Sequence, residues 1–91
     1  MKLVEEPLRL FANDEHGHLK AEVTLIAVND NLWSLNHTFV HPDLRGQGIA
    51  EELVAEAVAK ARREKKAIVP SCSFAKVQFE RKPEYADVWH K

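Results

Sequence analysis

The chain has 91 residues, of which 45% are hydrophobic and 30% are charged, and its formal net charge is -1. This composition is typical of a folded globular protein and argues against a disordered or fibrous chain. A net charge so close to zero provides no general attraction to nucleic acid. No apolar run approaches the roughly 18 residues that a membrane helix requires. Because Cys72 is the single cysteine, no intrachain disulfide is possible. We therefore expect one domain over residues 1–91 in a reducing cytoplasm, without a membrane or nucleic-acid partner.

The first half of the sequence predicts an antiparallel meander of three strands. A short strand is expected over Leu8–Ala12, and alternating apolar and polar residues predict a second strand over residues 18–28. A third extended run covers Leu32–His41. Short clusters of Asn, Asp and Gly separate the three runs, and connections of this length join antiparallel neighbours.

The second half predicts two helices around one more strand. Apolar residues at helical spacing predict a helix over residues 48–65, followed by a strand over Ala67–Pro70. A second helix is expected over Phe74–Lys82, with Ser73 as its N-cap, before an aromatic tail that folds back on the core. A strand that follows a crossover helix runs parallel to the preceding strand. The predicted fold class is therefore α+β, a three-stranded meander with a parallel fourth strand.

A polar, glycine-rich turn lies between the third strand and the first helix. Gly46 and Gly48 allow positive φ angles and a close backbone approach, and Arg45 adds a positive charge. The first N–H groups of a helix lack partners within it and suit an anion, most often a phosphate. The alternative is a plain strand-to-helix connection in which the glycines serve only the turn.

Three segments in order resemble a compact subfamily of the GNAT acetyltransferase superfamily. The run Arg45-Gly46-Gln47-Gly48-Ile49-Ala50 matches that superfamily's pattern Arg/Gln-x-x-Gly-x-Gly/Ala, placed between a strand and a helix. The subfamily similarity continues in residues 36–40, 69–74 and 83–85, and it extends over nearly the full chain. The chain looks shorter than a typical superfamily member, which leaves the elements that usually build the acceptor site unaccounted for.

This resemblance implies that the chain binds acetyl-coenzyme A. The pyrophosphate is expected on the backbone of the turn, and the pantetheine arm is expected to pair with the main chain of the third strand. The thioester is then expected at the end of the fourth strand. The residues implied in cofactor binding are Phe39, Val40, Leu44, Arg45, Gly46, Gln47, Gly48, Ile49, Ala50, Ser71 and Ser73.

Cys72 and His37 are the candidate catalytic residues. A lone cysteine is usually a small hydrophobic residue, but Cys72 lies beside a predicted helix N-terminus, a position that lowers a thiol pKa. It either carries the acetyl group as a covalent intermediate or positions or protonates the departing coenzyme A thiolate. A neutral His37 can accept the proton of an attacking amine. The alternative for His37 is a core histidine, and no metal site is expected.

The predicted function is transfer of an acetyl group from acetyl-coenzyme A to an unidentified amine, small molecule or protein, by a monomer or weak homodimer. The developing oxyanion is expected to be held by a strand N–H near Phe39 or Val40. One alternative is a module that binds coenzyme A or a protein partner with little catalysis. A further alternative is another phosphate-containing ligand on the same turn.

Overall fold

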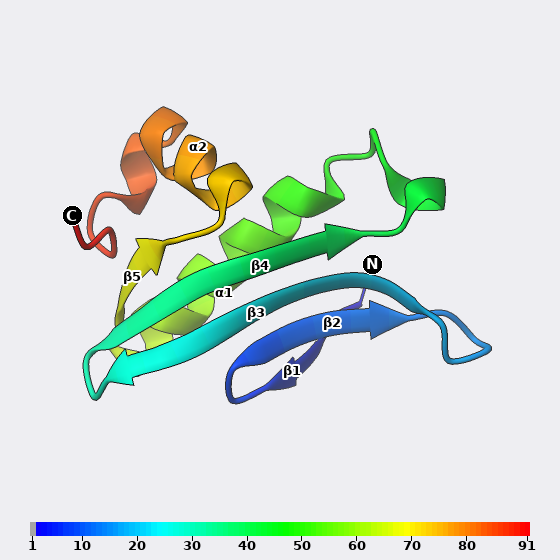
Figure 1. The fold of residues 1–91 in the computed structure, drawn as a ribbon, viewed down its shortest axis with the longest axis horizontal. Coiled ribbons are helices and arrows are strands. Elements are labelled where there is room, and N and C mark those ends of the chain that lie inside the picture. Colours follow the sequence, from blue (N-terminus) through cyan, green and yellow to red (C-terminus); the bar gives the residue numbers. More distant parts are fainter. Residues whose placement is uncertain (1) are drawn as a thin grey trace.

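The computed structural model describes residues 2–91, which form one mixed sheet with two helices (Figure 1). The sheet has five strands in the order β1-β2-β3-β4-β5. The first four strands are antiparallel neighbours, and β5 runs parallel to β4, as predicted. The elements are β1 (Val4–Glu6), β2 (Arg9–Asn13), β3 (Leu19–Asn29), β4 (Leu32–Val40), α1 (Ile49–Glu64), β5 (Ala67–Pro70) and α2 (Ser73–Arg81), with short 3-10 turns at Pro42–Leu44 and Pro83–Tyr85.

Strand β1 was not predicted, so the antiparallel part of the sheet has four strands where the sequence indicated three. Its residues pair with β2, with Glu5 opposite Leu10. All three β1 residues are exposed, so the strand shows no apolar alternation. An edge strand this short is held by its neighbours and carries no periodic signal of its own.

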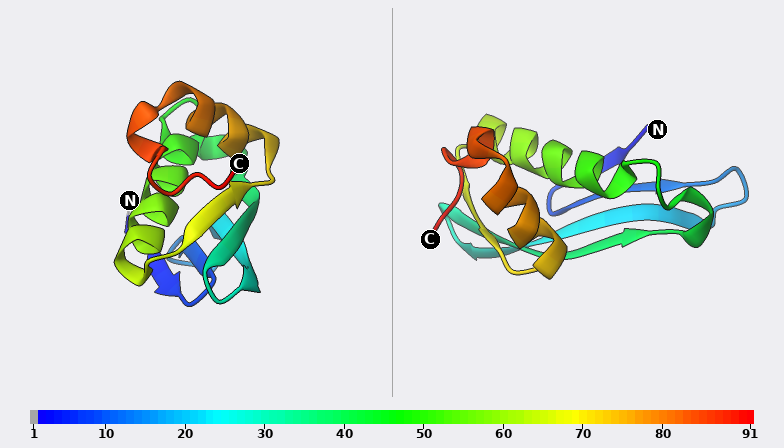
Figure 2. Two further views of the ribbon diagram at one scale, coloured as in Figure 1. Left: turned by 90° about the vertical axis from the view of Figure 1, so that its left-hand side faces the viewer. Right: turned by 90° about the horizontal axis from the view of Figure 1, so that it is seen from above.

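Helix α1 covers one face of the sheet, and α2 packs at the β5 edge (Figure 2). The apolar stripe of α1 is fully buried against the inward-facing residues of the central strands. Each Val, Leu or Ile side chain among them contributes about 1.5–3 kcal/mol when it leaves water. The fully buried side chains include Val23, Leu35, Leu53, Val54, Ala57, Val58, Ala61 and Ile68.

Lys60 of α1 anchors β1 to the helix. Its side chain is only 3% exposed, and its Nζ lies 2.9 Å from Glu5 Oε2 and 2.6 Å from Glu64 Oε2. Burial alone would lower the pKa of Lys60, but the hydrogen bonds to the two carboxylates outweigh it and raise that pKa. Lys60 is buried in these pairs, whereas the side chains of Glu5 and Glu64 are 45% and 42% exposed. This contact explains how an exposed three-residue strand stays in the sheet.

The C-terminal tail folds back onto the core, as predicted. Tyr85 and Val88 are buried, and the Phe79 ring lies 5.3 Å from that of Tyr85 and 5.8 Å from that of Trp89. Backbone hydrogen bonds join Ile68 to the tail on both sides. Among residues 2–91, neither helix has the length and apolar character needed to cross a membrane.

The predicted N-cap of α2 was wrong by one residue. Cys72 occupies the N-cap position, with φ -78° and ψ 134°, and Ser73 is the first helical residue. The N–H groups of Ser71 and Cys72 both donate to the carbonyl oxygen of Leu35, each at 3.0 Å. These two bonds fix the chain where it leaves β5, so the helix begins one residue earlier than the hydroxyl of Ser73 suggested.

Candidate functional site

Strand β4 loses its neighbour on the β5 side halfway along its length. Strand β5 pairs only with Leu32–Leu35, after which the chain turns into α2. Residues 37–40 of β4 stay paired with β3 on the other side. The second half of β4 is therefore a free edge between the start of α1 and the start of α2 (Figure 1). The pairing of β4 with β5 thus ends five residues before β4 itself ends at Val40.

The register determines which backbone groups point into this gap. The N–H of His41 donates to the carbonyl of Lys20 on β3 at 2.8 Å. Alternate residues of an antiparallel strand direct their backbone groups to the same side. Phe39 therefore directs its N–H toward β3, whereas Thr38 and Val40 direct theirs toward the free edge.

The glycine-rich turn lies at one end of the free edge. Gly46 has φ +82° and Gly48 has φ +76°, which confirms that both glycines adopt conformations other residues rarely reach. Gly48 is the N-cap of α1 and has no side chain to satisfy the helix. Within residues 2–91, no atom accepts a hydrogen bond from the N–H groups of residues 46–51. The positive end of the α1 dipole adds to the pull of these donors on an anion.

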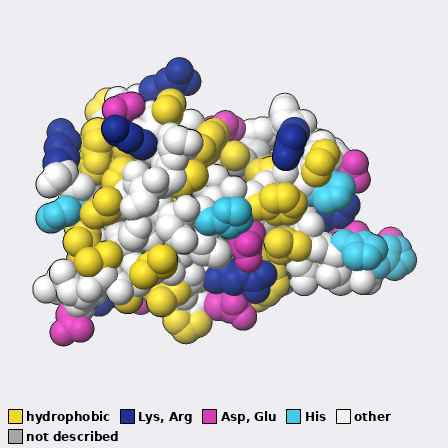
Figure 3. Space-filling model, in the orientation of Figure 1, with side chains coloured by type: hydrophobic (Ala, Val, Ile, Leu, Met, Phe, Trp, Pro, Cys, Tyr) yellow, Lys and Arg dark blue, Asp and Glu magenta, His cyan; other side chains and the backbone are white. Residues whose placement is uncertain are grey.

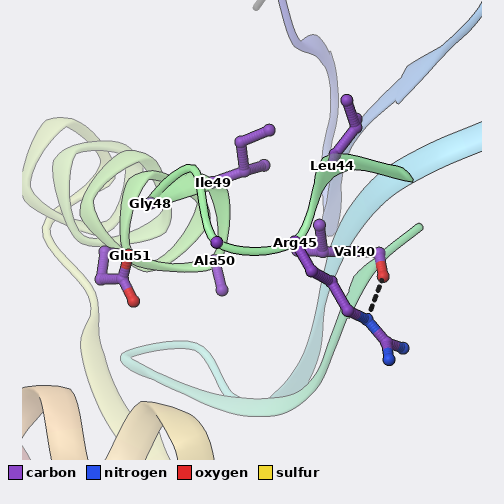
Figure 4. Close-up of a pocket in the computed structure, with 8 residues that line it drawn as sticks. Val40, Leu44, Arg45, Gly48, Ile49, Ala50 and Glu51 are labelled. Carbon is purple, nitrogen blue, oxygen red and sulfur yellow. Dashed lines mark hydrogen bonds between the residues drawn. The ribbon is translucent and has the colours of Figure 1, made fainter. Parts of the chain in front are cut away.

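A cavity of about 300 Å³ adjoins this turn (Figure 4). Arg45 reaches back along it, and its Nε donates to the carbonyl oxygen of Val40 at 3.3 Å. The exposed Gln47, which was also predicted, does not line the cavity, whereas Glu51, which was not predicted, does. The lining residues are Val40, Leu44, Arg45, Gly46, Gly48, Ile49, Ala50 and Glu51.

Cys72 lies at the other end of the free edge. Its half-buried side chain packs against the core, and its Sγ lies 3.5 Å from the hydroxyl oxygen of Thr38. Thr38 was not singled out from the sequence, because a threonine in a strand is ordinary. Its position in the sequence could have indicated it. Thr38 directly precedes the predicted site residue Phe39, so its side chain points to the opposite face of β4.

The environment of Cys72 favours its thiolate. Burial alone would raise the pKa of the thiol, but the N–H of Ala75, the hydroxyl of Thr38 and the N–H groups of Phe74 and Thr38 together lower it below its ordinary value. The sulfur makes no regular capping hydrogen bond to α2, so the helix N–H groups act on it as nearby dipoles. The N–H groups of Ala75 and Phe74 act in the direction expected of a helix N-terminus, and the role of Cys72 stays a prediction.

Ser71 and Ser73 flank Cys72 but face outward. The hydroxyl oxygens of Ser71 and Ser34 are 2.6 Å apart, which ties the end of β5 to β4. Ser73 is exposed in the first turn of α2. Their predicted roles in cofactor binding stay predictions.

His37 and Phe39 lie on the face of the sheet that α1 does not cover. Thr38 pairs with Val23, which is buried beneath α1, so the residues on either side of Thr38 point to the opposite face. The His37 Nε2 lies 3.7 Å from Glu22 Oε1, and its side chain is 50% exposed. The structure therefore brings Cys72 together with Thr38 and places His37 across the sheet from both. Figure 3 views this uncovered face, where apolar and charged side chains are mixed.

Comparison with known proteins links this arrangement to one family. The family model described as GCN5-related N-acetyl-transferase matches residues 9–88. The solution NMR structure of a GCN5-like protein from Staphylococcus aureus is 31% identical in sequence, with a TM-score of 0.81, and the match covers 98% of this chain and 87% of that one. No curated protein sequence matches the chain significantly.

Two more distant structures share the fold alone. A GNAT family acetyltransferase from Elizabethkingia anophelis, solved with acetyl-CoA bound, has a TM-score of 0.59 at 14% identity, and the match covers 80% of this chain and 50% of that one. A ribosomal-protein-alanine N-acetyltransferase from Brucella melitensis biovar Abortus 2308 has a TM-score of 0.54 at 24% identity, with 80% of this chain and 59% of that one covered. This chain is therefore similar to about half of each larger protein.

Proposed function

The chain belongs to the GCN5-related N-acetyltransferase family, and on that premise we propose how its own residues transfer an acetyl group from acetyl-coenzyme A to an amine. The glycine-rich turn binds the cofactor's pyrophosphate, and the free edge of β4 binds its pantetheine arm. Cys72 lies where the thioester arrives. A cofactor held in this way spans the gap from the start of α1 to the start of α2.

The observation that carries this proposal is the set of unpaired N–H groups at residues 46–51. The first N–H groups of a helix have no partner within it, and an anion can accept hydrogen bonds from them. The positive φ angles of Gly46 and Gly48 orient these donors without a Cβ in the way. A pyrophosphate supplies the acceptor oxygens that they lack. The N–H and C=O groups of Thr38 and the N–H of Val40 then offer strand-like pairing to an extended amide chain.

The acetyl group is transferred at the Cys72 end of the gap. In the direct route the amine nitrogen attacks the thioester carbonyl carbon, the C–S bond breaks, and coenzyme A leaves as a thiolate. The ammonium gives up its proton, and the coenzyme A thiolate takes one, from Cys72 or from water. The N–H of Val40 or Thr38 stabilises the developing oxyanion.

In the covalent route the Cys72 sulfur attacks the thioester first. Coenzyme A leaves as its thiolate, and the acetyl group stays on Cys72 until the amine displaces it. The lowered pKa of Cys72 favours this route, because it raises the thiolate fraction near neutral pH.

His37 accepts the amine proton only for an acceptor that approaches from the uncovered face of the sheet. Its Nε2 lies 3.7 Å from Glu22 Oε1 on that face. Glu22 itself lies 2.5 Å from Arg9 Nε, so part of its charge is already compensated. An acceptor amine that approaches from the uncovered face would therefore pass both the Glu22 carboxylate and the Arg9 guanidinium.

Titration calorimetry with coenzyme A tests the cofactor assignment. We expect saturable binding that adenosine diphosphate competes for weakly, because the nucleotide reaches the turn but not the free edge. Absence of binding would remove the assignment. Competition by the nucleotide as strong as that by coenzyme A itself would instead favour a different phosphate ligand.

Mass spectrometry separates the two routes to transfer. After incubation with acetyl-coenzyme A, the covalent route adds one acetyl group to the intact protein, and Cys72→Ala abolishes this addition. If the wild-type protein stays unmodified while an amine is acetylated, the covalent route is wrong and the direct route is supported.

A further inference from the structure

Thr38 places its side-chain hydroxyl beside the sulfur of Cys72. Its hydroxyl oxygen lies 3.5 Å from Sγ, and its backbone N–H points to the same free edge of β4. We infer that Thr38 is the positioning residue of Cys72 and that its hydroxyl holds the sulfur in place and stabilises its thiolate. The inference rests on the proposed function only in giving the thiol a role in acetyl transfer.

The backbone fixes where this hydroxyl lies. Thr38 pairs with Val23 on β3, so its side chain points to the α1 side of the sheet, where Cys72 packs against the core. A β-branched side chain has restricted rotation about χ1. The hydroxyl therefore lies on the same side of the sheet as the sulfur.

The contact crosses between two elements that share no ladder at this point. Strand β5 leaves β4 after Leu35, and Cys72 belongs to the turn into α2. The O–H···S contact between Thr38 and Cys72 spans the gap that opens there. It links the free half of β4 to the start of α2 and sets the distance between sulfur and strand.

A hydroxyl donor matters here because the sulfur is half-buried. Burial disfavours a thiolate unless donors replace the lost water. The charged residues nearest along the two elements do not face the sulfur. His37 lies on the opposite face beside Glu22, and Lys76 is exposed on α2. Thr38 is the residue whose side-chain hydroxyl contacts this sulfur.

Two substitutions separate the hydroxyl from the backbone. Thr38→Val keeps the shape and the N–H but removes the hydroxyl, whereas Thr38→Ser keeps the hydroxyl. Thr24→Val is the matched control, because Thr24 is also in the sheet and its hydroxyl donates to Asn36 Oδ1 at 2.8 Å, away from the sulfur.

The test measures alkylation of Cys72 by iodoacetamide as a function of pH, without any cofactor. We expect Thr38→Val to shift the rate profile to higher pH and to slow alkylation at pH 7 by about three- to tenfold, since a hydrogen bond to a charged group is lost. Thr38→Ser should restore the wild-type profile to within about twofold, and Thr24→Val should match the wild type.

A Thr38→Val profile that superimposes on the wild type would overturn the inference, as would a Thr38→Ser profile as slow as that of Thr38→Val. If Thr38→Val fails to show cooperative thermal unfolding, Thr38→Ala takes its place in the same comparison. Because the readout needs no coenzyme A, failure of the calorimetric titration and failure of this test are distinguishable.

Discussion

The two helices that border the free edge of β4 begin in different ways. Helix α1 begins at Gly48, in the left-handed region with φ 76°, and brings no side chain to its own N–H groups. Helix α2 begins at Cys72, in extended backbone, with a thiol held beside its first turn. Neither start has a regular side-chain cap.

The difference shows how one structural feature serves two purposes. A helix N-terminus favours negative charge in both cases. At α1 the glycines leave the donors open to an anion from outside the chain. At α2 the anion is the thiolate that the chain supplies. We therefore expect changes at α1 to alter cofactor affinity and changes at α2 to alter the chemistry.

The largest expected effect comes from removing the thiol at the start of α2. Cys72→Ala should slow the release of coenzyme A from acetyl-coenzyme A, in the presence of a panel of primary amines, by about 100-fold or more. A thiol-reactive dye measures the release. Calorimetry on the same variant should give an affinity for coenzyme A within about threefold of the wild type, because the turn at α1 is untouched. An unchanged release rate would mean that Cys72 takes no part in the reaction.

Gly48→Glu changes the start of α1 instead. The new carboxylate repels the pyrophosphate, and its Cβ would lie 3.3 Å from Glu51 Oε2 at a backbone angle that side chains rarely adopt. We expect the affinity for coenzyme A to fall by about 30- to 100-fold, equal to about 2–3 kcal/mol.

Gly17→Glu is the matched control for this change. Gly17 has φ +83° and no neighbour within 4 Å of an added Cβ, and it lies in the loop between β2 and β3. The Gly17→Glu substitution therefore places a side chain at a similar positive φ angle and adds the same negative charge, but away from the cavity. Equal loss of affinity in the two variants would show that strain or net charge, rather than the turn, is responsible.

Two neutralising substitutions at the cavity should act in opposite directions. Arg45→Gln removes a positive charge and should weaken coenzyme A binding by about two- to fivefold. Glu51→Gln removes a negative charge that borders the same cavity and should strengthen binding by a similar factor, about two- to fivefold. Both effects should shrink in 1 M salt. Changes of the same sign would place the pyrophosphate elsewhere.

The smallest effect concerns stability. The folded-state pKa of Cys72 is lowered relative to the unfolded chain, so its ionisation stabilises the fold above the unfolded pKa, about 8.5, and this contribution is lost as pH falls through the folded value. The difference in free energy of unfolding between wild type and Cys72→Ser should grow from pH 6 to pH 9. Urea denaturation at each pH measures it. A difference that is flat or shrinks as pH rises would contradict the lowered pKa.

Sequence alone predicted most of the fold because apolar alternation and helical spacing are local signals. The turn was predicted from Gly46 and Gly48, whose conformation the structure confirms. Strand β1 escaped prediction because all its residues are exposed. The N-cap of α2 was misplaced because Leu35 fixes it across the sheet, a contact that local sequence does not reveal.

The position of Thr38 escaped prediction for a related reason. Which face a residue of β4 occupies depends on the irregularity in the ladder where Thr24 pairs with His37 and Leu25 pairs with Leu35. One extra residue reverses the alternation beyond it. Pairing register of this kind is set by tertiary contacts. His37 consequently lies across the sheet from Cys72, although both were candidates for one site.

The central claim is that coenzyme A spans the free edge of β4 from the start of α1 to the start of α2. Backbone amide NMR during a titration with coenzyme A tests it most directly. We expect the largest shifts at residues 46–51 and at Thr38 and Val40, with residues 14–18 of the β2–β3 loop unchanged. Shifts confined to other surfaces, or none at saturating coenzyme A, would contradict the account.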